Sequence, residues 1–197
     1  MNLILSLVDF VLHLDAHLAE MVLQYGFWVY GILFLIIFVE TGLVLMPFLP
    51  GDSLLFAAGA LAATGSLKLP LLLVLLGVAA ILGDTVNYWI GHQAGQRAFD
   101  GRIRFLKKSH LDRTHEFFNK HGGKAVILAR FVPIVRTFAP FVAGAGAMNY
   151  RRFVIFNITG GVAWTLLLTF AGFFFGNLPF VRENFSLVVL VVVAISL

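Results

Sequence analysis

The sequence has no cysteine and few charged residues. The absence of Cys from all 197 residues excludes disulfides, thiol chemistry and Cys-ligated metal. Lys, Arg, Asp and Glu make up 12% of the chain, about half of the roughly 25% found in soluble domains. Hydrophobic residues make up 60%, and the mean hydropathy is +0.94. A helix needs about 20 apolar residues to cross a bilayer, and several apolar runs in this chain are close to that length. We therefore expect an all-α integral membrane protein with one membrane domain over residues 1–197.

Basic residues are missing from the first third of the chain and concentrated later. No Lys or Arg precedes Lys68, so the basic start of a cleavable signal peptide is absent. Eight of the 14 Lys and Arg fall within residues 96–124, and Arg151 and Arg152 form a second basic pair. The positive-inside rule predicts that residues 96–124 form a cytoplasmic loop, which can also contact anionic lipid headgroups. A nucleic-acid partner is not expected for so apolar a chain.

The apolar runs outline the membrane segments. Polar residues at spacings of three and four from Asn2 to Gln24 predict an amphipathic helix over residues 1–24, at the interface or against the bundle. Spans are expected over residues 26–45, 69–90 and 153–175, with the start of a last span over residues 185–197. The last apolar run reaches Leu197, so we expect a polar C-terminal tail beyond it.

Two apolar segments, residues 46–65 and 125–148, are interrupted by proline and glycine. Each is too short for two full spans, so we expect two half-helices in each, forming a re-entrant hairpin. The residues expected to shape these hairpins are Pro47, Pro50, Gly51, Pro133 and Pro140. If residues 96–124 are cytoplasmic, the hairpins enter from opposite faces. That pattern predicts an inverted-repeat helical bundle, typical of transporters with a site near the midplane.

Four charged residues lie in or beside the interrupted segments: Glu40, Asp52, Arg130 and Arg136. A charge at mid-bilayer costs about 2.5–3.5 kcal/mol on insertion scales, so we expect the acids to face the arginines around a small polar cavity. The planar fork of arginine suits phosphate, which predicts that Arg130 and Arg136 bind one. Glu40 and Asp52 are predicted to couple protonation to gating. The alternative is that these ion pairs only lock the hairpins together.

A second set of polar and aromatic residues accompanies these charges: Asp84, Asn87, Asn157 and Trp164. Asp84 lies in the middle of the span over residues 69–90, where a site role and a helix-packing role both remain open. Asn157 and Trp164 are expected to line or brace the same core. Gly83, Gly91 and Gly95, at spacings of eight and four, predict close helix packing rather than a nucleotide-binding loop.

Three stretches of the sequence match a known family. They are Phe38–Glu40 with Phe48–Ser53; Gly83–Tyr88 through Gly91 and Gly95; and Arg130–Pro140 with Ala143, Gly144, Met148, Phe153, Asn157, Gly160 and Trp164. On these stretches the chain resembles the DedA family of bacterial inner-membrane proteins, also called the SNARE-associated or VTT-domain superfamily. The resemblance covers nearly the whole chain. The motifs are specific together, whereas any one alone is weak.

The resemblance implies a function that composition does not show. Family members are associated with moving lipid phosphates across the bilayer, notably recycling undecaprenyl phosphate to the cytoplasmic face, with dependence on the proton motive force. The family's essential acidic and basic positions correspond to Glu40, Asp52, Arg130 and Arg136 here. A basic C-terminal tail of the family is missing from this sequence. The resemblance also implies a multi-pass location in the bacterial inner membrane.

Four functions follow as alternatives. We expect a transporter or flippase for a lipid phosphate, with protons as the coupling ion, and neither a cofactor nor a metal. An uncoupled phospholipid scramblase, as the eukaryotic relatives are, is the runner-up. A membrane enzyme such as a lipid phosphatase is not expected, because all six His lie outside the two interrupted segments. A non-transporting assembly or division factor would use the charged hairpins only structurally. The sequence leaves a homo-oligomer open.

Overall fold

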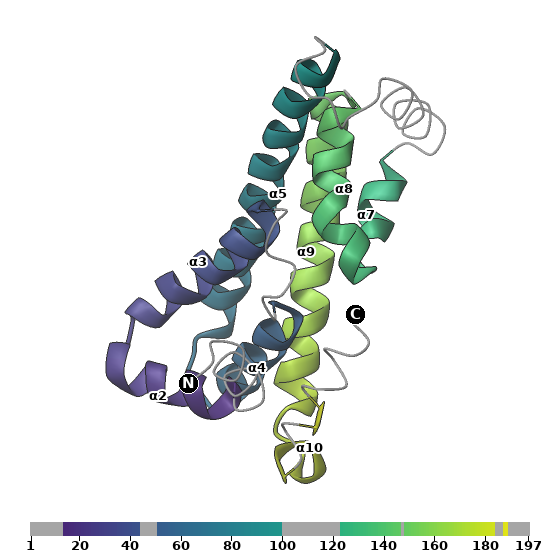
Figure 1. Cartoon of the computed structure of the whole chain (residues 1–197). Coiled ribbons are helices and arrows are strands. Elements are labelled where there is room, and N and C mark those ends of the chain that lie inside the picture. The colour runs from purple at the N-terminus through teal and green to yellow at the C-terminus, as the bar shows by residue number, and fades with distance from the viewer. Residues whose placement is uncertain (1–13, 44–50, 100–122, 147, 184–186, 189–197) are drawn as a thin grey trace. The chain divides into compact units, whose positions relative to one another are not determined.

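The computed structural model describes residues 14–43, 51–99, 123–146, 148–183 and 187–188, and all regular structure among them is helical (Figure 1). The helices are α2 (Leu14–Tyr25), α3 (Trp28–Gly42), α4 (Gly51–Ala63), α5 (Leu69–Phe99), α7 (Lys124–Ala129), α8 (Pro133–Ala145), α9 (Tyr150–Phe175) and α10 (Pro179–Glu183). The all-helical prediction is confirmed for these residues. Parts of the predicted amphipathic helix, first hairpin, basic loop and last span lie outside them.

Contacts between residues divide the chain into two compact units. The first unit comprises Met1–Ile37, Phe48–Val78 and Thr165–Leu197, and the second comprises Phe38–Pro47 and Ala79–Trp164. Helices α2, α4 and α10 belong to the first unit, and α7 and α8 belong to the second. The division falls within α3, α5 and α9, so each of these helices contributes residues to both units.

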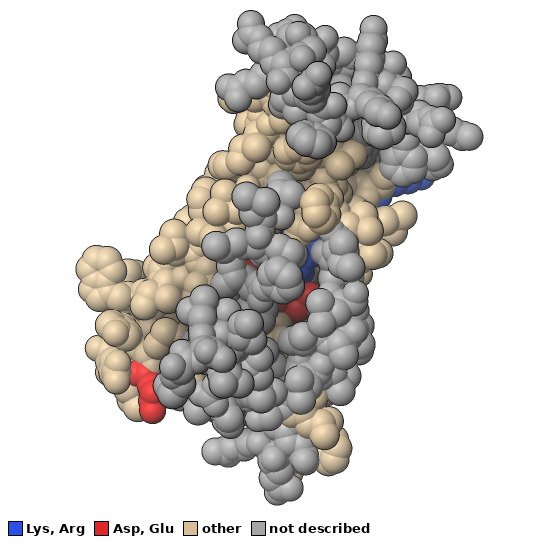
Figure 2. All heavy atoms as spheres, in the orientation of Figure 1, with Lys and Arg blue, Asp and Glu red and all other residues tan. Residues whose placement is uncertain are grey.

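Two of the described helices are long and apolar enough to cross a membrane, over Leu69–Ala94 and Tyr150–Phe175. Along α5, apolar side chains at every third or fourth position are exposed: Val74, Val78, Leu82, Val86, Trp89 and Ile90. An unbroken apolar stripe of this kind is unfavourable in water and favourable against lipid. On the face in Figure 2, most of the described surface belongs to residues other than Lys, Arg, Asp and Glu. These features fit a membrane protein.

The shorter apolar helices α3 and α4 have 15 and 13 residues, less than the about 20 that span a bilayer. In the first unit, α4 packs closely against α9. A Cβ at Gly59 would collide with the carbonyl oxygen of Thr169, and a Cβ at Gly172 would collide with that of Phe56. Because small residues let helix backbones approach in this way, the α4–α9 contact resembles packing within membranes.

In the second unit, glycines bring the end of α3 and part of α8 against α5. A Cβ at Gly83 would lie 2.8 Å from the carbonyl oxygen of Phe38, and a Cβ at Gly144 would lie 2.8 Å from the amide nitrogen of His92. A Cβ at Gly91 would collide with the carbonyl of Phe141. The predicted close packing is therefore confirmed at Gly83 and Gly91. It holds the polar residues of α5 near those of α3 and α8.

The interrupted segment 125–148 forms two short helices, α7 and α8, that contact each other. The helical run breaks after Ala129, and Val132 adopts an extended conformation with φ −114° and ψ 106°. Pro133 then occupies the start of α8, where its fixed φ and missing N–H are tolerated. Pro140 lies inside α8, which continues to Ala145. The break thus precedes Pro133, and Arg130 lies at the end of α7.

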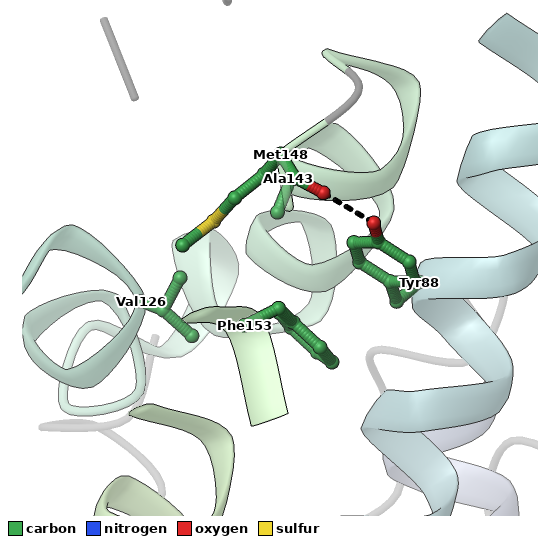
Figure 3. Packing of buried hydrophobic residues seen from close by; sticks show 5 residues of the cluster. All are labelled: Tyr88, Val126, Ala143, Met148 and Phe153. Atoms are coloured by element: carbon green, nitrogen blue, oxygen red, sulfur yellow. Dashed lines mark hydrogen bonds between the residues drawn. The ribbon is translucent and has the colours of Figure 1, made fainter. Parts of the chain in front are cut away.

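An apolar cluster packs around Tyr88 in the second unit (Figure 3). Its buried members are Tyr88, Val126, Ala143, Met148 and Phe153. The ring of Tyr88 stacks on that of Phe153 with centroids 4.5 Å apart, and its hydroxyl donates to the carbonyl oxygen of Met148. The cluster joins α5 to α7, α8 and the start of α9, and so it fixes the helices that carry the polar residues described next.

Candidate functional site

Two buried ion pairs lie together in the second unit. Arg130 Nη2 lies 2.7 Å from Asp84 Oδ2, and Arg136 Nη2 contacts Glu40 Oε1. The side chains of Arg130, Asp84, Arg136 and Glu40 are only 6%, 9%, 12% and 2% exposed. Each acid comes from a helix that precedes the arginines by many residues, so the pairs join α3 and α5 to the α7–α8 segment.

Arg130 is held by helix carbonyls as well as by Asp84. Its Nη1 donates to the carbonyl oxygen of Asn157, at 3.0 Å, and to the Oδ1 of the same residue, at 3.1 Å. Its Nη2 donates to the carbonyl oxygen of Ala80 at 3.4 Å. A Cβ at Gly161 would lie 2.9 Å from Arg130 Nη1, so the glycine leaves room for the guanidinium against α9. Arg130 therefore bridges α5 and α9.

Trp164 lies against both arginines. The Cζ atoms of Arg130 and Arg136 lie 5.7 Å and 5.0 Å from its ring centroid. Both distances are within the about 6 Å over which a ring face attracts a cation. Trp164 itself is 3% exposed. One buried ring thus contacts two like charges, and its attraction for each offsets part of the repulsion between them.

Two asparagines connect the helices around the ion pairs. Asn87 Nδ2 donates to the carbonyl oxygens of Thr41, at 3.2 Å, and Thr137, at 2.8 Å. Thr41 lies in the last turn of α3, where carbonyls lack a helical donor. Asn157 Nδ2 donates to the carbonyl oxygen of Ile81 at 3.0 Å. Both asparagine side chains therefore link helices by donating to backbone carbonyl oxygens of neighbouring helices.

A small cavity borders these groups. Its lining residues are Glu40, Thr41, Asp84, Arg130, Arg136, Thr137 and Trp164, and its volume is about 10 Å³. A cavity of this size holds about one water molecule. With both ion pairs formed, the cavity is too small for a phosphate group.

The structure brings most of the predicted site residues together and adds one pairing that sequence reasoning did not assign. Glu40 and the two arginines lie around the cavity with Trp164, and Asn87 and Asn157 lie beside them. Asp84, given no partner by the sequence, is the acid on Arg130. Asp52 belongs to the first unit, in the first turn of α4.

One feature of the sequence could have indicated that Asp84 needs a basic partner. It is the sole acidic residue between Lys68 and Asp100, and a charge in a span calls for a nearby partner. With three candidate acids and two arginines, one sequence does not say which acid pairs with which arginine. As for metals, no group of three or more His, Asp or Glu side chains among the described residues could hold an ion.

Comparison with known proteins gives the family. The VTT domain matches residues 49–174 of the chain. The chain belongs to the DedA family of VTT-domain proteins. Protein DedA of Escherichia coli is 56% identical over 200 residues, covering 100% of this chain and 91% of that protein. No solved structure matches the chain.

Other membrane proteins match the chain at lower identity. An uncharacterized membrane protein of Mycobacterium tuberculosis is 46% identical over 170 residues, covering 85% of this chain and 74% of that protein. Inner membrane protein YqjA of E. coli is 41% identical over 151 residues, covering 76% of this chain and 69% of that protein. The matched VTT domain contains Asp84, both arginines and Trp164, whereas Glu40 precedes it. This DedA-family protein is accordingly a membrane protein.

Proposed function

We propose that this DedA-family protein moves a lipid phosphate across the bilayer, with undecaprenyl phosphate as the expected substrate. The observation that carries the proposal is the pair of buried arginines under one Trp ring, each held by an acid. Buried ion pairs contribute little net stability compared with apolar packing, so their presence favours a functional role. Arginine is also the side chain best suited to bind phosphate oxygens in pairs.

The acids allow a phosphate to exchange with a carboxylate on the arginines of the site. A carboxylate and a phosphate compete for the same guanidinium donors, and the cavity has no room for both. When a carboxylate moves away from its arginine and remains in an apolar environment, its neutral form is favoured and it takes up a proton. Proton uptake by Glu40, as one acid of the cluster, would thereby accompany phosphate binding. Asp52 is proposed as a second proton-exchanging acid, in the first unit.

The proposal includes a topology. We propose re-entrant hairpins over residues 46–65 and 125–148, an inverted repeat, and a cytoplasmic basic loop over residues 96–124 in the bacterial inner membrane. The two short helices α7 and α8, with the break between them at Arg130, support the second hairpin. Because the chain has no Cys, a single Arg104→Cys variant can be labelled cleanly. Labelling from the cytoplasmic side supports this topology, and labelling from the periplasmic side refutes it.

The transport proposal is tested in proteoliposomes that contain undecaprenyl phosphate. Its movement between leaflets is measured with and without an inward-directed proton gradient for the wild type, Arg130→Ala and Arg136→Ala. Arg151→Ala is the matched control, because it removes the same charge from an exposed position on α9. We expect gradient-stimulated movement in the wild type and the control, and loss of it in both site variants.

Other results would point to the alternative functions. Movement that ignores the proton gradient and tolerates other phospholipid headgroups would indicate a scramblase. No movement of any lipid by correctly folded protein would refute transport and favour an assembly or division factor. Release of inorganic phosphate from the lipid would instead indicate an enzyme. Our proposal requires no bond to be broken.

A further inference from the structure

The turn that joins α2 to α3 exposes several large apolar side chains (Figure 1). Every residue from Leu23 to Trp28 is exposed. The large apolar and aromatic residues among them are between 51% and 86% exposed: Leu23, Tyr25, Phe27 and Trp28. A contiguous patch of this kind is unfavourable in water and marks a contact with lipid or with another protein. The patch belongs to the first unit, whereas the proposed lipid-phosphate site belongs to the second.

The backbone on both sides of this turn is fixed to the rest of the first unit. Helix α2 packs against α4, and Leu18 in α2 and Val29 at the start of α3 are fully buried. Gly26 follows the last residue of α2 with φ 51°, and its amide nitrogen donates to the carbonyl oxygen of Val22 at 3.0 Å. A glycine in this conformation ends a helix and reverses the chain. The exposed side chains are therefore presented by a defined turn.

Tyr30 connects this turn to the start of α5. Its hydroxyl accepts a hydrogen bond from the backbone amide of Lys68, at 2.6 Å. The ring centroids of Tyr30 and Phe27 lie 5.5 Å apart. Lys68 is exposed, and the apolar span Leu69–Ala94 begins at the next residue. The aromatic turn thus lies at the level where α5 passes from polar surroundings into hydrocarbon.

The residues before Lys68 are polar where the α2–α3 turn is apolar. Thr64 and Ser66 are exposed in the turn between α4 and α5, and their hydroxyl oxygens lie 3.0 Å apart. Trp and Tyr rings are enriched at the boundary between hydrocarbon and headgroups, and lysine side chains extend from that boundary toward water. Polar residues, a lysine and exposed aromatic rings therefore meet at one level, as expected where a protein crosses a membrane surface.

We propose that the α2–α3 turn is an anchor for the phospholipid interface, with the side chains of Leu23, Tyr25, Phe27 and Trp28 in the boundary between acyl chains and headgroups. Lys68 lies at the level of the headgroups. Lipid is favoured over a second copy of this chain, because the bilayer already surrounds the span that begins beside Tyr30. The anchor fixes the depth of the first unit in the membrane and does not depend on the proposed function.

Single spin labels test this placement cleanly, because the chain has no Cys. Leu23→Cys and Trp28→Cys each receive a nitroxide in the full chain, in vesicles of phosphatidylethanolamine and phosphatidylglycerol. Thr64→Cys is the matched control, since it is also exposed in a turn of the first unit. Collision rates are measured with molecular oxygen, which concentrates in hydrocarbon, and with a water-soluble nickel chelate. We expect the oxygen rate to exceed the nickel rate at Leu23 and Trp28, and the reverse at Thr64.

Each other pattern overturns the proposal. A higher nickel rate at Leu23 and Trp28 would place the turn in water. Low rates with both reagents, together with spin–spin broadening, would show that a second copy of the chain covers the turn. A higher oxygen rate at Thr64 as well would show that no membrane boundary lies at this level. Because both turn positions are exposed, the labels leave the buried core unchanged, and thermal unfolding of each labelled variant checks this.

Discussion

Asp84 and Arg130 form a buried ion pair between α5 and the end of α7, with 2.7 Å between Oδ2 and Nη2. Breaking one half of such a pair leaves an uncompensated buried charge, which costs about 3–5 kcal/mol. We therefore expect Asp84→Asn to lower the free energy of unfolding by about this amount. Unfolding in detergent, followed by denaturant titration, measures the change.

A double variant separates the ion pair from mere loss of a polar group. Asp84→Asn combined with Arg130→Gln removes both charges and keeps both side chains polar. We expect the double variant to be more stable than the sum of the two single changes predicts, with a coupling of about 1–3 kcal/mol. Strict additivity of the two changes would show that the pair adds nothing beyond its separate hydrogen bonds.

Gly83 sets how closely the end of α3 approaches α5. A Cβ at this position would collide with Thr41 Oγ1 and lie 2.8 Å from the backbone oxygen of Phe38. Because the backbone cannot yield as a flexible side chain would, we expect Gly83→Ala to destabilise the protein by about 1–3 kcal/mol. It should also weaken the Glu40–Arg136 pair, since Glu40 lies on the displaced part of α3.

The matched control lies on the same helix. A Cβ at Gly77 would meet nothing within 4 Å, so Gly77→Ala should stabilise α5 by about 0.5–1 kcal/mol through its better helix propensity. Thermal unfolding of the two alanine variants side by side checks both signs. Equal stability of the two variants would contradict the close approach of α3 to α5.

Much of this arrangement could be predicted from local sequence features. The scarcity of charged residues and the apolar runs predict membrane helices, and two long ones are found over Leu69–Ala94 and Tyr150–Phe175. Prolines and glycines predict the interruption of segment 125–148, which contains the short helices α7 and α8. The cost of burying charge singled out Arg130 and Arg136 as residues that need acidic partners.

The pairing itself could not be predicted, because it depends on distance in space. Arg136 and Glu40 are 96 positions apart in the chain, and nothing local links Arg130 to Asp84 rather than to Asp52. The sequence leaves both a site role and a helix-packing role open for Asp84. Its role depends on the carbonyls of Ala80 and Asn157, which hold the guanidinium within its reach. The identities of the side chains do not indicate which backbone carbonyls will lie near a given guanidinium.

The hydroxyl of Tyr88 connects α5 to the segment that precedes α9, by donating to the carbonyl oxygen of Met148 (Figure 3). Tyr88→Phe keeps the ring that stacks on Phe153 and removes only the donor. We expect a loss of about 1 kcal/mol in the free energy of unfolding, the usual net worth of one hydrogen bond. Tyr150→Phe is the control, because Tyr150 is 39% exposed and should tolerate loss of its hydroxyl. Equal effects of the two changes would argue against a structural role for the Tyr88 hydrogen bond.

Trp164 presents one ring to two guanidinium groups, at 5.7 Å from Arg130 and 5.0 Å from Arg136. A desolvated cation–π contact is worth about 2 kcal/mol, and Trp is the strongest of the aromatic partners. Trp164→Phe keeps a weaker aromatic face, whereas Trp164→Leu keeps an apolar side chain without one. We expect Trp164→Leu to lower the free energy of unfolding by about 1–2 kcal/mol more than Trp164→Phe.

Removal of a cation distinguishes this attraction from simple packing. In an Arg136→Gln background, one of the two cation–π contacts is already absent, so the difference between the Leu and Phe variants at position 164 should shrink. Denaturant unfolding of the four variants gives that difference directly. If it stays unchanged, the ring contributes volume alone. If it shrinks, the attraction of one ring for two cations offsets part of their mutual repulsion, and the arginines can remain close enough to bind a single phosphate.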